Sequence, residues 1–204
     1  MMNHRMPSDP HLRRWMMFVD GENFTIRGQQ FCSKNNISLS GDKYWKKNIY
    51  MWMPGPKANE LFFNSDEANL GLQYLGERAF YYTSLTGSLE DKNSVEESLH
   101  NLGFNPKVFL KTRQEEKSKG VDVHLTTDIL SNAYLNNYDV ALIVTGDADF
   151  IPAIEEVKRL GKIVYVCFFT GKENGLSPRL SLTSDKNINI TGLFEKVWRE
   201  WKSS

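Results

Sequence analysis

Apolar and polar positions alternate along the chain in blocks that predict strands separated by helices. The pattern predicts strands over residues 15–19, 78–85, 105–113, 139–146 and 162–169; several of them, residues 15–19 above all, are apolar throughout, as in strands covered on both faces. Apolar positions spaced by three or four residues predict helices over 90–104, 121–137 and 147–161. Gly103 and Gly161 stand where glycine commonly ends a helix. Strands that alternate with helices indicate an α/β fold with a parallel sheet between helical layers.

The remaining segments give weaker patterns. Residues 24–35 and 66–77 have helical character, and residues 35–66 form an insertion or a small hairpin around a Pro-Gly-Pro break. We expect residues 1–13 to be a flexible lead-in and residues 14–204 to form one domain that ends in a helix at 192–202. That last helix carries Phe194, Val197, Trp198 and Trp201 at helical spacing, either as a core stripe or as the contact of a homodimer.

Composition limits the class of protein but does not identify a binding partner. A chain of 204 residues with 40% hydrophobic content can bury one sizeable core. Lys plus Arg and Asp plus Glu are both 25, so the formal net charge exerts no overall attraction on nucleic acid, although a local basic rim is compatible with it. Cys32 and Cys167 lack any CxxC spacing, and no apolar run is long enough to cross a membrane. We therefore expect a cytoplasmic protein without a membrane partner.

Carboxylates follow two of the predicted strands directly. Asp20 follows residues 15–19, and Asp147 follows the strand over 139–146. Ligands of parallel sheets bind beyond the carboxyl ends of the strands, so both side chains should point into one crevice. Asp122, at the first turn of a predicted helix, is a third candidate.

Such a cluster predicts a magnesium or manganese site. Carboxylates brought together repel one another unless a cation or a proton lies between them. Mg²⁺ and Mn²⁺ prefer oxygen ligands, and Mg²⁺ keeps several waters, so a few carboxylates suffice. A cation held there can activate water and neutralise charge on a phosphodiester.

Several neighbouring residues also have ordinary structural interpretations. Asp149 and Asn23 could each cap a helix. Gly21 and Gly146 could serve tight turns after strands, and Glu22 could be a solvated loop residue. Asp128 lies six residues after Asp122, about 600° around a helix, so it does not share a face with Asp122.

The stretches "FVDGENF", "KGVDVHLTTDIL" and "ALIVTGDADFIPAI", followed by "GKIVYV", resemble in this order the NYN domain of the LabA-like group, within the PIN-like nuclease superfamily. The resemblance covers roughly residues 14–195. It implies a three-layer α/β/α sandwich, PIN-like or Rossmann-like, with a central, mostly parallel sheet. It also implies a ribonuclease site that uses Mg²⁺ or Mn²⁺.

Carried over by motif, the catalytic residues implied by the resemblance are Asp20 and Asn23 from the first stretch, Asp122 from the second, and Asp147 and Asp149 from the third. Asp20, Asp122 and Asp147 would hold the metal, and Asp149 would complete the acidic cluster. Asn23 and Thr145 would orient water or a phosphate oxygen. Lys119 could meet substrate phosphate.

The expected partner is RNA, single-stranded in particular. Lys46 and Lys47 lie in "KYWKK", which interleaves aromatic and basic residues as single-strand binders do, although a structural hairpin explains the run equally well. His124 fits a structural role better than that of a general base. Further possible basic contacts are Lys43, Lys111, Arg113, Lys117, Lys172 and Arg179.

Two other functions remain open at this point. The acidic motifs also resemble those of haloacid-dehalogenase-like phosphatases, but such enzymes require a second aspartate where this chain has Glu22. The other alternative is a PIN-like module that binds RNA or protein without cleaving.

Overall fold

The structure is a computed structural model, and it describes residues 13–37, 45–46, 49–50, 75–111, 120–171, 175–192 and 194. Residues 1–12 of the expected lead-in, most of the expected insertion and the tail beyond residue 194 lie outside this range. The predicted domain boundaries therefore stay predictions.

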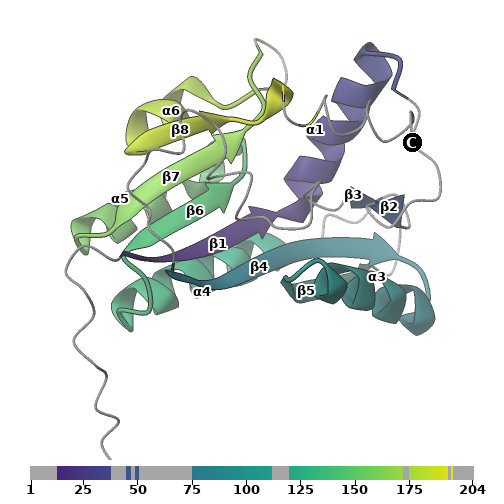
Figure 1. Ribbon diagram of the computed structural model, residues 1–204, viewed down its shortest axis with the longest axis horizontal. Helices are drawn as coiled ribbons and strands as arrows, with labels where there is room; N and C mark the ends of the chain where they lie inside the picture. The colour runs from purple at the N-terminus through teal and green to yellow at the C-terminus, as the bar shows by residue number, and fades with distance from the viewer. Residues whose placement is uncertain are drawn as a thin grey trace, which may run out of the picture.

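A six-stranded sheet forms the centre of the molecule, in the order β5-β4-β1-β6-β7-β8. Each pair of neighbouring strands runs parallel, as Figure 1 shows. The strands are β1 (Arg14–Asp20), β4 (Leu75–Thr86), β5 (Asn105–Lys111), β6 (Val140–Val144), β7 (Ile163–Phe168) and β8 (Lys186–Asn189). The predicted α/β fold with a parallel central sheet is confirmed.

Helices cover both faces of this sheet, which makes three layers. The α1 face carries α1 (Gly21–Lys34) and α3 (Leu89–Asn101). The α4 face carries α4 (Val121–Tyr134), α5 (Ile151–Arg159) and the short α6 (Pro178–Thr183). A 3-10 turn, η2 (Ala148–Phe150), precedes α5.

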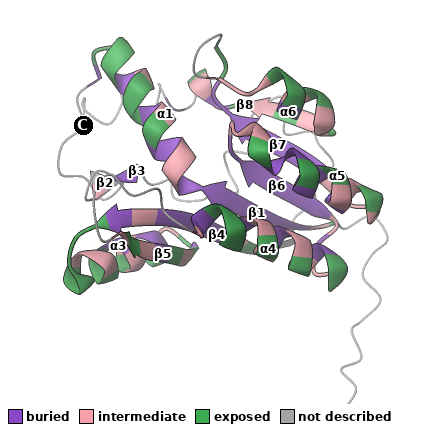
Figure 2. Ribbon diagram, turned by 180° about the vertical axis from the view of Figure 1, so that it is seen from behind, coloured by how far each residue is buried: buried purple, intermediate pink, exposed green. Residues whose placement is uncertain are grey.

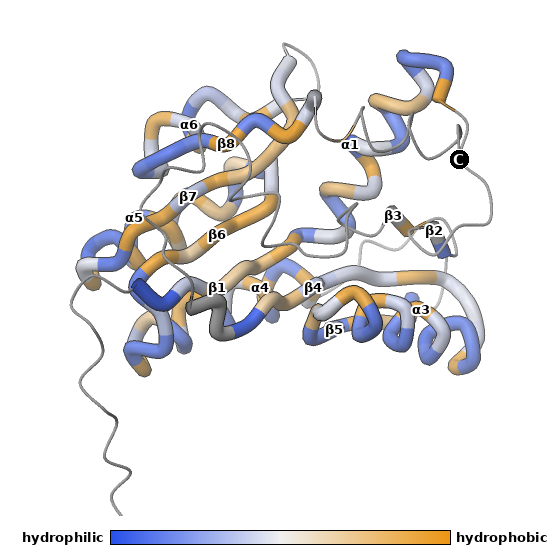
Figure 3. Tube along the Cα trace, in the orientation of Figure 1, coloured by the Kyte–Doolittle hydropathy of each residue, from blue (hydrophilic) through white to orange (hydrophobic). Residues whose placement is uncertain are grey.

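Strand β1 supplies both halves of the core because successive side chains point to opposite faces. Trp15, Met17 and Val19 pack on the α1 face, and Met16 and Phe18 pack on the α4 face. Figure 2 shows β1, β6 and β7 buried, whereas the helices turn exposed residues outward. Figure 3 shows the same split in hydropathy: β6 and β7 are largely apolar, and the helices are of mixed character.

The prediction of a helix over residues 66–77 is wrong at its carboxyl end. Residues 75–77 belong to β4, where Leu75 pairs with Arg14 and Gly76 pairs with Trp15. The pairing shifts register after Trp15, so Glu77 is the extra residue of an irregularity. Pairing with the buried strand β1 overrides a weak local helical pattern, and residues 66–74 lie outside the described range.

The expected hairpin is present where the structure describes it. Strand β2 (Trp45–Lys46) pairs antiparallel with β3 (Ile49–Tyr50), and Ile49 is buried. Helix α1 contacts β3, so this small sheet packs on the α1 side of the molecule.

Near the end of the described chain, Thr191, Gly192 and Phe194 are helical. The Phe194 ring packs edge-on against Phe24, Phe31 and Phe169, which places it in the core rather than at a dimer contact. Within the described ranges, no helix has the length and apolar character needed to cross a membrane.

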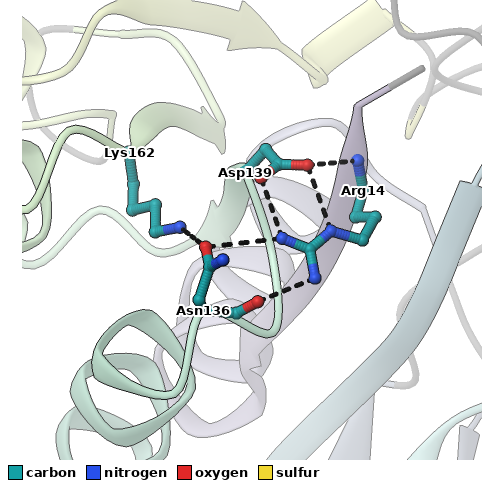
Figure 4. Close-up of polar contacts among 4 residues, drawn as sticks. All are labelled: Arg14, Asn136, Asp139 and Lys162. Atoms are coloured by element: carbon teal, nitrogen blue, oxygen red, sulfur yellow. Dashed lines mark hydrogen bonds and ion pairs between the residues drawn. The ribbon is translucent and has the colours of Figure 1, made fainter. Parts of the chain in front are cut away.

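A polar cluster fixes the amino-terminal edge of the sheet (Figure 4). The Arg14 guanidinium donates to both carboxylate oxygens of Asp139, at 3.2 Å and 3.0 Å, and to the Asn136 carbonyl at 2.7 Å. The backbone N–H groups of Arg14 and Asp139 also donate across the two segments. Lys162 donates to the Asn136 side chain. These contacts tie the start of β1 to the residues before β6 and β7.

Candidate active site

The carboxyl ends of β1 and β6 lie side by side at the point where the strand order reverses. From β1 the chain continues to β4 and β5 on one side of β1, and β6, β7 and β8 then follow on the other side. Val19 pairs with Val144, so Asp20 and Thr145 leave the sheet together. This reversal is the position at which open α/β sheets bind ligands.

Asp20 is almost completely buried, with 3% of its surface exposed. One carboxylate oxygen accepts from the backbone N–H of Asn23 at 3.0 Å, which makes Asp20 the N-cap of α1. The other oxygen accepts from the Thr145 hydroxyl at 2.8 Å. The cap role that the sequence offered to Asn23 is therefore taken by Asp20.

The pKa of Asp20 is raised from 3.8 to about 7. Burial raises this pKa most, the hydrogen bonds from Asn23 and Thr145 lower it, and the charges of Asp122 and Asp147 raise it again. Two further carboxylates therefore lie close enough to disfavour a negative charge on Asp20. This coupling supports the predicted convergence of Asp20, Asp122 and Asp147.

The residues after β6 are held by hydrogen bonds from backbone N–H groups to the side chains of nearby residues. The Asp147 N–H donates to the Thr145 hydroxyl at 3.2 Å, and the Asp149 N–H donates to the Asp147 carboxylate at 2.9 Å. Asp147 therefore caps η2, and Asp149 lies exposed inside the turn, so Asp149 is not the cap. Thr145 is completely buried, and its hydroxyl is turned toward Asp20.

Asn23 links the two strand ends. Its side-chain oxygen accepts from the Gly146 N–H at 3.1 Å, across a sequence separation of 123 residues. The amide oxygen is thus used to position the loop after β6. Whether its amide nitrogen orients water or phosphate, as the resemblance implies, stays a prediction.

At Gly21 and Gly146, neighbouring atoms leave no room for a side chain, and this lack of room, rather than turn geometry, accounts for the glycines. A Cβ on Gly21 would lie 2.1 Å from Tyr81 Cε1 and 2.7 Å from the Tyr82 carbonyl oxygen. A Cβ on Gly146 would lie 2.4 Å from Phe168 Cε1. Neither glycine has a positive φ, so the two strand ends need glycine for close approach to neighbouring strands.

Asp122 stands in the first turn of α4. The preceding Gly120 has a φ of +107°, which favours glycine there. Asp122 is exposed, and a negative charge near a helix N-terminus is favourable, so its position also has a structural explanation. We include Asp122 in the candidate site because its charge raises the pKa of Asp20.

Asp128 and His124 have partners of their own. The buried Tyr82 hydroxyl donates to Asp128 at 2.7 Å, and burial, together with this carboxylate, raises the pKa of Tyr82 well above its usual range. The His124 ring lies against Phe109 with ring centres 4.9 Å apart. Both contacts join α4 to the sheet, but His124 is itself exposed, so its structural interpretation stays a prediction.

The predicted basic contacts fall largely outside the described residues. Lys47 and Lys119 are not among them, and Lys46 lies half-buried in β2. The structure instead places Lys111 against Glu22, with Nζ 2.5 Å from the Glu22 carboxylate. The sequence is compatible with Glu22 as a solvated loop residue and gives no sign of this ion pair. Its partner Lys111 stands at the carboxyl end of β5, the same kind of position that identified Asp20.

The donor set fits a hydrated hard cation. Among the described residues, no group of three or more His, Cys, Asp or Glu side chains is arranged as a ready-made metal cluster. Mg²⁺ commonly binds through one or two carboxylates and keeps the rest of its shell as water. Asp20, with Asp122 and Asp147 acting on it electrostatically, supplies oxygen ligands of the required type, and burial together with these two charges disfavours a negative charge on Asp20.

Three comparisons place the chain among known proteins. The family model of the NYN domain matches residues 14–191. An uncharacterised protein of Methanocaldococcus jannaschii is 35% identical over 99 residues, which are 48% of this chain and 37% of that protein. The chain therefore spans well under half the length of that relative.

The crystal structure of a protein of unknown function from Vibrio parahaemolyticus has a TM-score of 0.57 and 18% identity. The superposition covers 89% of this chain and 95% of that protein, and it supports the fold alone. The family match does not separate the LabA-like group from other NYN domains, so that finer assignment stays a prediction.

Proposed function

Because the chain belongs to the NYN domain family, whose members are nuclease-like, we propose that it is a ribonuclease that uses Mg²⁺ or Mn²⁺ to hydrolyse single-stranded RNA. The observation that carries the proposal is the buried Asp20 carboxylate at the reversal of strand order, with its pKa raised to about 7. Burial of an ionised carboxylate is unfavourable, and groups with strongly shifted pKa values gather at functional sites.

Each residue of the site has a role that follows from its contacts. Asp20, Asp122 and Asp147 would hold the cation, directly or through water, and Asp149 adds negative charge beside them. Thr145 and Asn23 position this set: the Thr145 hydroxyl donates to the Asp20 carboxylate, and the Asn23 side-chain oxygen accepts from the Gly146 N–H. A bound Mg²⁺ or Mn²⁺ would supply activated water and neutralise charge on the phosphodiester.

The family match does not support the haloacid-dehalogenase-like alternative, which rested on the same acidic motifs. A non-catalytic RNA- or protein-binding module is the remaining competitor. It predicts RNA binding that persists when hydrolysis is absent.

The direct test is cleavage of labelled single-stranded RNA by the purified protein with Mg²⁺, with Mn²⁺ or with EDTA. We expect cleavage only with a metal, and a loss of about a hundredfold or more in Asp20→Asn and Asp147→Asn, since a catalytic cation contributes several kcal/mol and about 1.4 kcal/mol is a factor of ten. Glu97→Gln removes an exposed carboxylate on α3 and serves as the matched control. Cleavage that persists at wild-type rate in the Asp20→Asn/Asp147→Asn double variant would refute the site.

A further inference from the structure

Lys111 is placed at the carboxyl edge of the sheet, on the face that the α4 helix covers. It is the last residue of β5 and pairs with Thr86 at the end of β4. Side chains two residues apart on a strand share a face, so Lys111 lies on the same side as Phe109. Phe109 contacts His124, which stands two residues after Asp122 in the first turn of α4.

The Lys111 side chain also reaches the first turn of α1. Its Nζ lies 2.5 Å from one Glu22 carboxylate oxygen, and the Ser84 hydroxyl donates to the other oxygen at 3.2 Å. Glu22 is two residues after Asp20 and directly precedes Asn23. The ammonium group is therefore held at the rim of the acidic crevice, next to the turn that carries Asp20.

This ion pair is an inefficient way to stabilise a fold. The Lys111 and Glu22 side chains are 16% and 27% exposed, so both are largely desolvated, and desolvation offsets most of the attraction in such pairs. An ammonium has three N–H donors. Within the described part of the chain, Glu22 is the one acceptor recorded for Lys111, which leaves donors for a ligand.

We propose that Lys111 binds a phosphate of the RNA strand beside the acidic crevice, with Glu22 and Ser84 as positioning residues that hold the lysine in place. The inference rests on the proposed ribonuclease function and names the contact that lets a polyanion approach several carboxylates. A compact ammonium is a common ligand for phosphate. Holding it in one position before RNA arrives reduces the entropy lost on binding.

The test measures binding of a short labelled single-stranded RNA by fluorescence anisotropy, in EDTA and over a series of salt concentrations. Lys111→Met should weaken binding about tenfold and reduce the slope of log K against log salt by about 0.7, the value for one phosphate contact on a single strand. Lys111→Arg should retain most of the affinity. In the cleavage assay, Lys111→Met should raise KM more than it lowers kcat.

Lys107→Met is the matched control because Lys107 is exposed on the same strand, four residues earlier, or about 13 Å away. Affinity and salt slope of Lys111→Met equal to those of Lys107→Met would overturn the inference. A lower unfolding temperature without a change in salt slope would likewise overturn it, since that result assigns Lys111 a structural role only. Failure of the wild type to bind or cleave RNA would refute the proposed function itself, whereas wild-type cleavage with an unaffected Lys111→Met variant refutes this inference alone.

Discussion

Asp20 is the residue at which stability and the proposed function compete. Its pKa is about 7 in the folded protein and 3.8 in an exposed chain, so the native state retains a proton that the unfolded state releases between these values. The stabilisation from this proton is complete below the unfolded pKa and is lost as pH rises through about 7. At neutral pH and above, the folded protein therefore holds a buried charge at a cost to stability.

We predict that Asp20→Asn becomes more stable than the wild type as pH rises from about 4 to about 8, by a few kcal/mol, since about 1.4 kcal/mol corresponds to each unit of pKa shift. Urea denaturation at several pH values measures the difference. The asparagine can keep the contact with the Asn23 N–H. A gap that is constant across this pH range would contradict the assignment of the raised pKa to Asp20.

Addition of metal should reverse this loss in the wild type. A cation that binds only the folded state stabilises it in proportion to the logarithm of its concentration. We expect millimolar Mg²⁺ or Mn²⁺ to raise the unfolding temperature of the wild type at about pH 8, where Asp20 is ionised, and to have little effect on Asp20→Asn. Equal shifts in the two proteins would mean that the cation binds elsewhere.

Thr145 shows how a buried hydroxyl can determine the state of a carboxylate. In Thr145→Val, Asp20 and the Asp147 N–H would each lose a partner, which costs about 1–3 kcal/mol in unfolding free energy. The pKa of Asp20 should rise further because the Thr145 bond lowers it. Thr145→Ser keeps the hydroxyl and should restore both properties, as denaturation and a pH series would show; equal losses in both variants would count against the hydroxyl.

At the scale of elements, the start of α1 is packed against β4 with no space for a side chain. In Gly21→Ala the new methyl group would clash with the Tyr81 ring and the Tyr82 carbonyl, so we expect a loss of about 1–3 kcal/mol in stability. Gly192 has open space around it and lies in a helical turn, so Gly192→Ala should be neutral or slightly stabilising. Thermal unfolding of both variants tests this, and similar effects at the two sites would contradict it.

The elements with strong patterns could be predicted from the sequence, and the others could not. The predicted strand over residues 15–19 and the helix over residues 121–137 agree with β1 and α4, because apolar period and burial agree there. Residues 75–77 were assigned to a helix, since strand pairing depends on a partner far along the chain. Sheet topology is the basis on which the convergence of Asp20 and Asp147 is predicted, whereas the contact between Lys111 and Glu22 depends on side-chain reach, which no local pattern encodes.

For the molecule as a whole, the two edges of the sheet have separate tasks. The carboxyl edge holds the acidic crevice, and the amino edge holds the cluster of Arg14 and Asp139, about 20 Å away along β1. Partial burial by itself would raise the pKa of Asp139, but the hydrogen bonds and charge of Arg14, together with the charge of Lys162, lower it.

Asp139→Asn should therefore reduce stability at neutral pH, by about 1 kcal/mol after allowance for solvent screening. Because the folded pKa of Asp139 is depressed, its contribution is present above the unfolded pKa and is lost as pH falls through the folded value. Denaturation curves of variant and wild type should converge in acid, while RNA cleavage at neutral pH stays unchanged. Loss of cleavage in a folded Asp139→Asn protein would show that the edges are coupled.

The bond between Asp20 and Thr145 joins residues 125 positions apart, and this separation has a consequence for synthesis on the ribosome. Asp20 is made before β4, β5 and α4, and the neighbouring strand β6, which Thr145 follows, emerges only after them. A nascent chain shorter than about Asp149 therefore has no complete crevice, whatever part of the sheet it has already formed. The proposed nuclease would therefore be inactive until β6 and the residues that follow it have left the ribosome.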